Sequence, residues 1–67
     1  MKPPILQYFA CDHLPTHLQE VSRPFGELAH HLVDILPDGT ERSVALRKLL
    51  ESKDAAVRAA LDTSEVG

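Results

Sequence analysis

The chain has 67 residues, too few for more than one domain. Its formal net charge of −3 argues against general nucleic-acid binding, which requires a positively charged surface. Its apolar fraction of 43% is too high for a disordered tail. A chain this short buries only about 60% of its unfolded surface, and its single cysteine, Cys11, excludes an intrachain disulfide. The composition therefore predicts that self-association supplies the missing buried surface.

Neither a membrane span nor a signal peptide is expected. No apolar run approaches the roughly 20 residues that a membrane span requires. The first residues lack a long apolar segment followed by a small-residue cleavage site. We therefore expect a cytoplasmic protein, and the lone thiol agrees with a reducing compartment.

Residues 1–13 are expected to form an N-terminal arm. Pro3 and Pro4 favour extended backbone at its start. The apolar stretch from Ile5 to Cys11 is too short to distinguish an irregular arm from a single helical turn. The arm carries Tyr8, an aromatic residue that the helical pattern after it does not need.

A regular apolar stripe predicts a helix over residues 15–36. Its members recur at steps of 3 and 4, and they are Leu14, Leu18, Val21, Phe25, Leu28, Leu32 and Ile35. Pro24 lies inside the stripe, where it cannot donate a helical hydrogen bond, and Ser22 before it is a good N-cap type. We therefore predict two helical pieces, roughly residues 15–21 and 23–36, that share one apolar face across a kink or a break.

The segment from Pro37 to Gly39 interrupts the pattern, and a second helix is predicted over residues 41–61. Thr40 can cap this helix, and Glu41 places a carboxylate in its first turn. Its apolar face consists of Leu46, Leu49, Leu50, Ala56, Val57, Ala60 and Leu61, with Lys53 interrupting the middle. Residues 62–67 have no pattern, and we expect a frayed tail there.

Two helices joined by about four residues predict an all-α antiparallel hairpin that forms one domain, residues 1–67. A lone hairpin buries one seam and leaves its outer apolar residues exposed, which is typical of an interface. We therefore predict that the hairpins assemble into a homo-oligomeric bundle. The pattern does not determine the number of protomers.

Residues that could bind a metal or carry catalysis are few. His13 and His17 stand four residues apart, but Pro15 lies between them and no further pair completes a zinc site. A second polar group consists of His30, His31 and Asp34. We interpret the first pair as solvent-facing or capping histidines and the second group as surface or interface residues. Cys11 beside Asp12 lacks the positive surroundings that activate a thiolate. The sequence therefore predicts no enzyme, no cofactor and no metal.

Tyr8 and Arg23 are the candidate ligand-binding residues. A tyrosine presented from an arm can stack on a nucleobase. Arg23, just before Pro24, is expected at the start of a helical piece, where a guanidinium and free backbone N–H groups suit a phosphate. From the pattern alone, the more common roles are packing on a neighbouring subunit for Tyr8 and a surface salt bridge for Arg23.

Consecutive segments of the chain carry a family resemblance. They are QYF from Gln7, HLP from His13, LQEVSRPFGELA from Leu18, ERSVALRKLLE from Glu41 and KDAAVRA from Lys53. Together they resemble the phage anti-CBASS cyclic-oligonucleotide sponges, a small helical-hairpin family that includes the phage sponge that counters Thoeris defence. The resemblance extends over about residues 5–61.

The resemblance implies a homohexamer without catalytic activity that sequesters cyclic dinucleotides such as cyclic GMP–AMP. In the cytoplasm of an infected bacterial host, sequestration keeps the messenger from its CBASS effector. In the family a tyrosine stacks on the base and a basic residue pairs with the cyclic phosphates, and Tyr8 and Arg23 match these positions. Where relatives carry Lys, Arg23 keeps the positive charge, and its planar guanidinium can contact one phosphate bidentately.

Some members of the family also hold cyclic trinucleotides at a second site. Arg58 is the candidate basic residue of that site here, whereas Phe9 offers no polar side-chain contact. No DNA or membrane partner is expected. The alternative interpretation is a small helical protein–protein interaction or regulatory module without a nucleotide ligand, and a zinc-dependent enzyme is a distant third.

Overall fold

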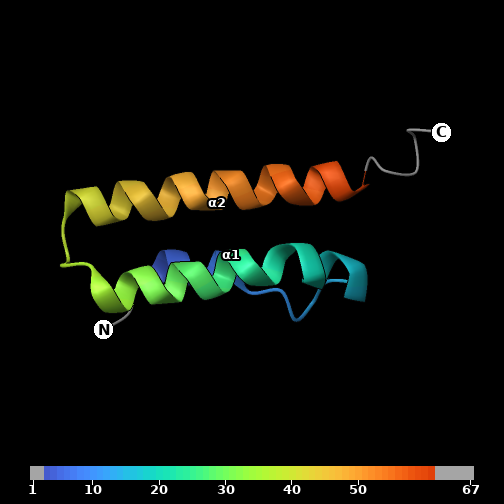
Figure 1. Ribbon diagram of the computed structural model, residues 1–67, viewed down its shortest axis with the longest axis horizontal. Coiled ribbons are helices and arrows are strands. Elements are labelled where there is room, and N and C mark those ends of the chain that lie inside the picture. Colours follow the sequence, from blue (N-terminus) through green and yellow to red (C-terminus); the bar gives the residue numbers. More distant parts are fainter. Residues whose placement is uncertain (1–2, 62–67) are drawn as a thin grey trace.

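The chain folds into a hairpin of two long helices with a short 3-10 helix beside them (Figure 1). In the computed structural model, which describes residues 3–61, η1 spans Pro4–Phe9, α1 spans Thr16–Ile35 and α2 spans Thr40–Leu61. No strand occurs in this part of the chain. The predicted all-α fold with two packed long helices is confirmed.

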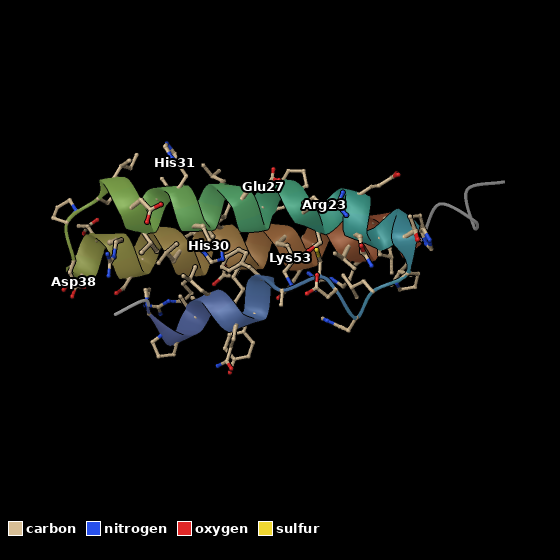
Figure 2. The ribbon with its side chains drawn as sticks, turned by 90° about the horizontal axis from the view of Figure 1, so that it is seen from below. Arg23, Glu27, His30, His31, Asp38 and Lys53 are labelled. Carbon is tan, nitrogen blue, oxygen red and sulfur yellow. The ribbon has the colours of Figure 1, made fainter. Side chains whose placement is uncertain are left out.

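The arm forms the 3-10 helix η1 and lies against both long helices (Figure 2). The sequence left open an irregular arm or a single helical turn, and the structure has the helical alternative. Pro4 begins η1, where the absence of a proline N–H is tolerated because first-turn N–H groups have no helical acceptor. The tail for which we expected fraying, residues 62–67, lies outside the described residues.

Pro24 lies inside a continuous α1 and does not divide it. A break between residues 15–21 and 23–36 is therefore wrong, whereas the kink stays a prediction. Pro24 and Glu20 are both exposed, so water can reach the Glu20 carbonyl, which lacks its helical donor. Arg23 consequently lies in mid-helix, not at a helix start where free N–H groups would adjoin it.

The buried face of α1 is rotated relative to the predicted apolar stripe. The inward residues recur at steps of 4 and 3, and they are Leu18, Ser22, Phe25, Ala29 and Leu32. Leu28 and Ile35, which belong to the predicted stripe, are 45% and 58% exposed. The small side chain of Ala29 leaves space at the seam, and Leu46 of α2, 1% exposed, packs there.

One hydrophobic core joins the arm to both helices. Its buried members are Leu6 and Phe9 of η1, Ala29 of α1 and Leu46 of α2. Partly buried residues pack around it, namely Ile5, Phe25, Leu32, Val33, Leu49 and Leu50. Because two helices alone bury a single seam, the arm supplies further apolar surface and is held in place by the same contacts.

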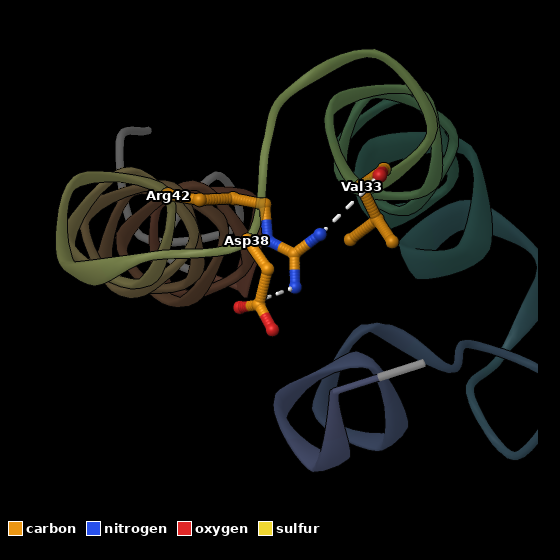
Figure 3. Close-up of polar contacts among 3 residues, drawn as sticks. All are labelled: Val33, Asp38 and Arg42. Carbon is orange, nitrogen blue, oxygen red and sulfur yellow. Dashed lines mark hydrogen bonds and ion pairs between the residues drawn. The ribbon is translucent and has the colours of Figure 1, made fainter. Parts of the chain in front are cut away.

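Arg42 of α2 ties the loop to the end of α1 (Figure 3). Its Nη1 donates a hydrogen bond to the Val33 carbonyl at 3.4 Å, and its Nη2 donates to Asp38 Oδ1 at 3.0 Å. The helical donor for the Val33 carbonyl would be the N–H of residue 37, which is a proline and has none. The guanidinium therefore replaces a donor that Pro37 cannot supply.

Candidate functional site

An open groove lies between the arm and α1. Its volume of about 550 Å³ is within the range of small-molecule sites, roughly 300–1,000 Å³. Its apolar lining comes from Leu6, Phe9, Ala10 and Gly26, and its polar lining comes from Cys11, Asp12, Arg23, Glu27, His30, His31 and Asp34. Several of the polar residues are labelled in Figure 2.

The groove is poorly suited to an anion by itself. Three of its lining residues are carboxylates, Asp12, Glu27 and Asp34, and Arg23 is its permanent cation. With the histidines neutral, the lining has a negative formal charge, which repels a phosphodiester. The formal charge of the lining therefore disfavours a dianionic ligand in this groove.

Tyr8 does not line the groove, and its side chain is 59% exposed. A 3-10 helix has three residues per turn, so Leu6 and Phe9 share one face of η1 and Tyr8 lies on another. The first two are buried in the core. The arm therefore anchors itself through Leu6 and Phe9 while presenting the Tyr8 ring to solvent.

Arg23 lines the groove from mid-α1 and is exposed. Its Nη2 donates a hydrogen bond to Gln19 Oε1 at 3.3 Å, and Gln19 Nε2 donates to the Leu14 carbonyl at 2.7 Å. The guanidinium is thus linked to the segment that leads into α1. Within one protomer the structure places Arg23 in the groove and Tyr8 outside it, so the two do not line a common cavity.

The remaining candidate residues are dispersed. Arg58 is exposed on α2 and does not line the groove. Cys11 is a half-buried free thiol at the groove. Among residues 3–61, no three His, Cys, Asp or Glu side chains are grouped so that they could hold a metal ion.

Lys53 is the polar residue whose role the sequence analysis missed. Lys53 interrupts the apolar face of α2, yet its side chain is only 13% exposed. Its Nζ donates a hydrogen bond to the Tyr8 carbonyl at 2.9 Å and lies 3.1 Å from Asp54 Oδ1. A single lysine within an otherwise apolar helix face is the sequence signal that could have directed attention to it.

Within the described part of the chain, no helix is long and apolar enough to cross a bilayer. Comparison with known protein families, characterised proteins and solved structures gives no match for this chain. The family resemblance is therefore carried by the sequence segments alone.

Proposed function

We propose that the protein binds and sequesters cyclic dinucleotides such as cyclic GMP–AMP, without transforming them, and so blocks CBASS immunity in an infected bacterial host. The observation that carries the proposal is the exposed Tyr8 ring on an arm whose neighbouring apolar residues are buried. An aromatic ring on an anchored segment loses little conformational freedom when a base stacks on it. The resemblance of the segments around Tyr8 and Arg23 supplies the ligand class.

In this proposal the ligand site is completed between protomers. Tyr8 and Arg23 line no common cavity in one chain, and the groove beside Arg23 has a negative formal charge. A cyclic dinucleotide has two bases and two phosphates in a nearly two-fold arrangement, so a symmetric oligomer can offer Tyr8 and Arg23 from two protomers to its two halves. Exposed Leu28 and Ile35 supply apolar surface for this assembly, a hexamer according to the resemblance.

A capture-and-release experiment tests the proposal. The protein is incubated with cyclic GMP–AMP and filtered, and the retained fraction is denatured and analysed by mass spectrometry. Intact ligand that appears only after denaturation supports sequestration. Degraded ligand would indicate an enzyme instead, and free intact ligand in the first filtrate would reject both.

A parallel assay addresses the proposed second site. A cyclic trinucleotide replaces cyclic GMP–AMP, and wild type is compared with Arg58→Ala. Selective loss of trinucleotide retention in the variant supports Arg58 as a residue of that site. Equal retention by both proteins removes Arg58 from it.

A protein–protein interaction module is the second candidate function. It is favoured by the exposure of Leu28 and Ile35 on α1, because large apolar side chains that remain in water often mark a docking surface. A stoichiometric protein partner in a pull-down, together with no thermal shift from any cyclic nucleotide, would favour this candidate over the sponge.

A further inference from the structure

Lys53 joins α2 to the arm at the residue that presents the exposed aromatic ring. Its Nζ donates to the backbone carbonyl of Tyr8 at 2.9 Å, and the two residues are 45 positions apart in the sequence. The lysine side chain is 13% exposed, whereas Asp54, which pairs with it at 3.1 Å, is 49% exposed. Most of the lysine side chain is therefore covered, while its ammonium makes these two contacts at the protein surface.

The Tyr8 carbonyl lies in the last turn of η1, where carbonyl groups lose their helical donors. The N–H of Ala10 donates to the Gln7 carbonyl at 3.3 Å. The next carbonyl, that of Tyr8, accepts from the Lys53 ammonium, and the carbonyl of Phe9 packs against Gly26 of α1. The end of η1 is therefore held from both long helices, with Lys53 as the charged contact.

We propose that Lys53 is a positioning residue for Tyr8: by holding the backbone carbonyl of Tyr8, it limits the orientations open to the exposed ring. Leu6 and Phe9 anchor the arm through their buried side chains, and the Tyr8 carbonyl needs a restraint of its own because helical donors end in the last turn of η1. The ammonium supplies that restraint through a charge-assisted hydrogen bond. The consequence for base stacking rests on the proposed function, whereas the restraint on the ring does not.

The chain contains one tyrosine and no tryptophan, so its intrinsic fluorescence reports on Tyr8. Time-resolved anisotropy separates fast motion of the ring from overall tumbling. We compare wild type with Lys53→Met, which keeps the apolar stem and removes the donor, and Lys53→Arg, which restores a cationic donor. Lys48→Met, at an exposed lysine of the same helix, is the matched control. Circular dichroism verifies that each variant keeps its helix content.

The expected result is a larger amplitude of fast depolarisation in Lys53→Met, with Lys53→Arg and Lys48→Met close to wild type. Cyclic GMP–AMP binding, measured on the same proteins, should weaken by up to about tenfold in Lys53→Met, because binding must then order a Tyr8 side chain that the wild-type protein already restrains. Unchanged fast depolarisation in a folded Lys53→Met protein overturns the proposal, whatever happens to binding. If wild type binds no cyclic nucleotide but the anisotropy changes as expected, the proposed function fails and the positioning role stands.

A measurement on the wild-type protein keeps the proposal testable even if Lys53→Met does not fold. Reductive methylation of lysines is followed by mass spectrometry, and the rate at Lys53 is compared with the rate at Lys48. An ammonium engaged by Tyr8 and Asp54 should react more slowly than the exposed one. Equal rates at the two lysines would contradict the proposed restraint.

Discussion

Gly26 of α1 lies directly against the backbone carbonyl of Phe9, so closely that a Cβ at position 26 would be 3.1 Å from the carbonyl oxygen. This approach is what allows η1 to pack on α1. By contrast, a Cβ at Gly39 in the loop would meet nothing within 4 Å. The two glycines therefore differ in what a larger side chain would displace.

We predict that Gly26→Val lowers the free energy of unfolding by about 1–3 kcal/mol, as overpacking typically does, because the added methyls push the Phe9 carbonyl away from α1. Gly39→Ala serves as the control and should change it by less, since the space there is open. Urea denaturation followed by circular dichroism measures both. Equal stability of Gly26→Val and wild type would show that the arm does not depend on this contact.

Ser22 is a buried polar residue whose removal should stabilise the protein. It is 0% exposed, and its Oγ has no hydrogen-bond partner among the described residues. A buried hydroxyl without a partner costs desolvation energy, and alanine has the higher helix propensity. Ser22→Ala should therefore raise the free energy of unfolding by about 1–2 kcal/mol. Ser52 of α2 is exposed, so Ser52→Ala changes helix propensity alone and serves as the control. If Ser22→Ala raises the free energy of unfolding no more than Ser52→Ala does, the buried hydroxyl carries no desolvation cost.

The two contacts of Arg42 should contribute unequally to stability. The Arg42 side chain is 11% exposed and donates to the Val33 carbonyl, whereas the side chain of the paired Asp38 is 89% exposed. We expect Arg42→Met to cost about 1 kcal/mol, because the Val33 carbonyl loses its donor while the stem stays packed. Asp38→Asn should cost less, since water and salt screen an exposed pair. Thermal melts at low and high salt distinguish the two, and a larger effect of Asp38→Asn would reverse our ranking.

Tyr8 and Arg23 should affect ligand binding and leave assembly intact. Both side chains are exposed, so their removal costs no core packing. Tyr8→Ala should weaken cyclic GMP–AMP binding by at least about tenfold, the value of one stacked base, while Tyr8→Phe keeps the ring and most of the affinity. Arg23→Ala should also weaken binding, and Arg23→Lys should restore part of it through charge alone. Loss of the oligomer in the alanine variants, seen by analytical ultracentrifugation, would favour packing roles instead.

Leu28 and Ile35 should matter for assembly more than for the fold of one chain. They are the exposed leucine and isoleucine of α1, and both lie outside the core. Leu28→Glu combined with Ile35→Glu places charge in the proposed contact between protomers, and we expect a lower sedimentation coefficient at micromolar concentration. Ser52→Glu at an exposed site of α2 should leave sedimentation unchanged. Wild type that sediments as a folded monomer at micromolar concentration would contradict the predicted assembly.

The sequence by itself determined the helical elements. The 3- and 4-residue spacing of apolar side chains and the interruption after Leu36 predict two helices, and the observed ones, Thr16–Ile35 and Thr40–Leu61, begin and end within one residue of the expected ranges. These signals are local, because periodicity and turn chemistry act within a few residues of the chain. Residue type and position also make Tyr8 and Arg23 candidates in the sequence, but Arg23 lies within α1 and not at a helix start, and their binding role stays a prediction.

Only the tertiary structure decided which side of α1 faces α2. Ala29 is buried and Leu28 is exposed, although the apolar periodicity predicts that Leu28 faces inward. A small residue suits the position where two helices approach most closely, and periodicity does not show where that position is. Pro24 remains within α1 because its side of the helix is open to water, a fact that the sequence does not contain. The hydrogen bond from Lys53 to Tyr8 joins residues 45 positions apart, so no local pattern could reveal it. Long-range packing determined these features. Local propensity specifies that a segment is helical, but it does not specify which side of the helix is buried or which distant residue a side chain contacts.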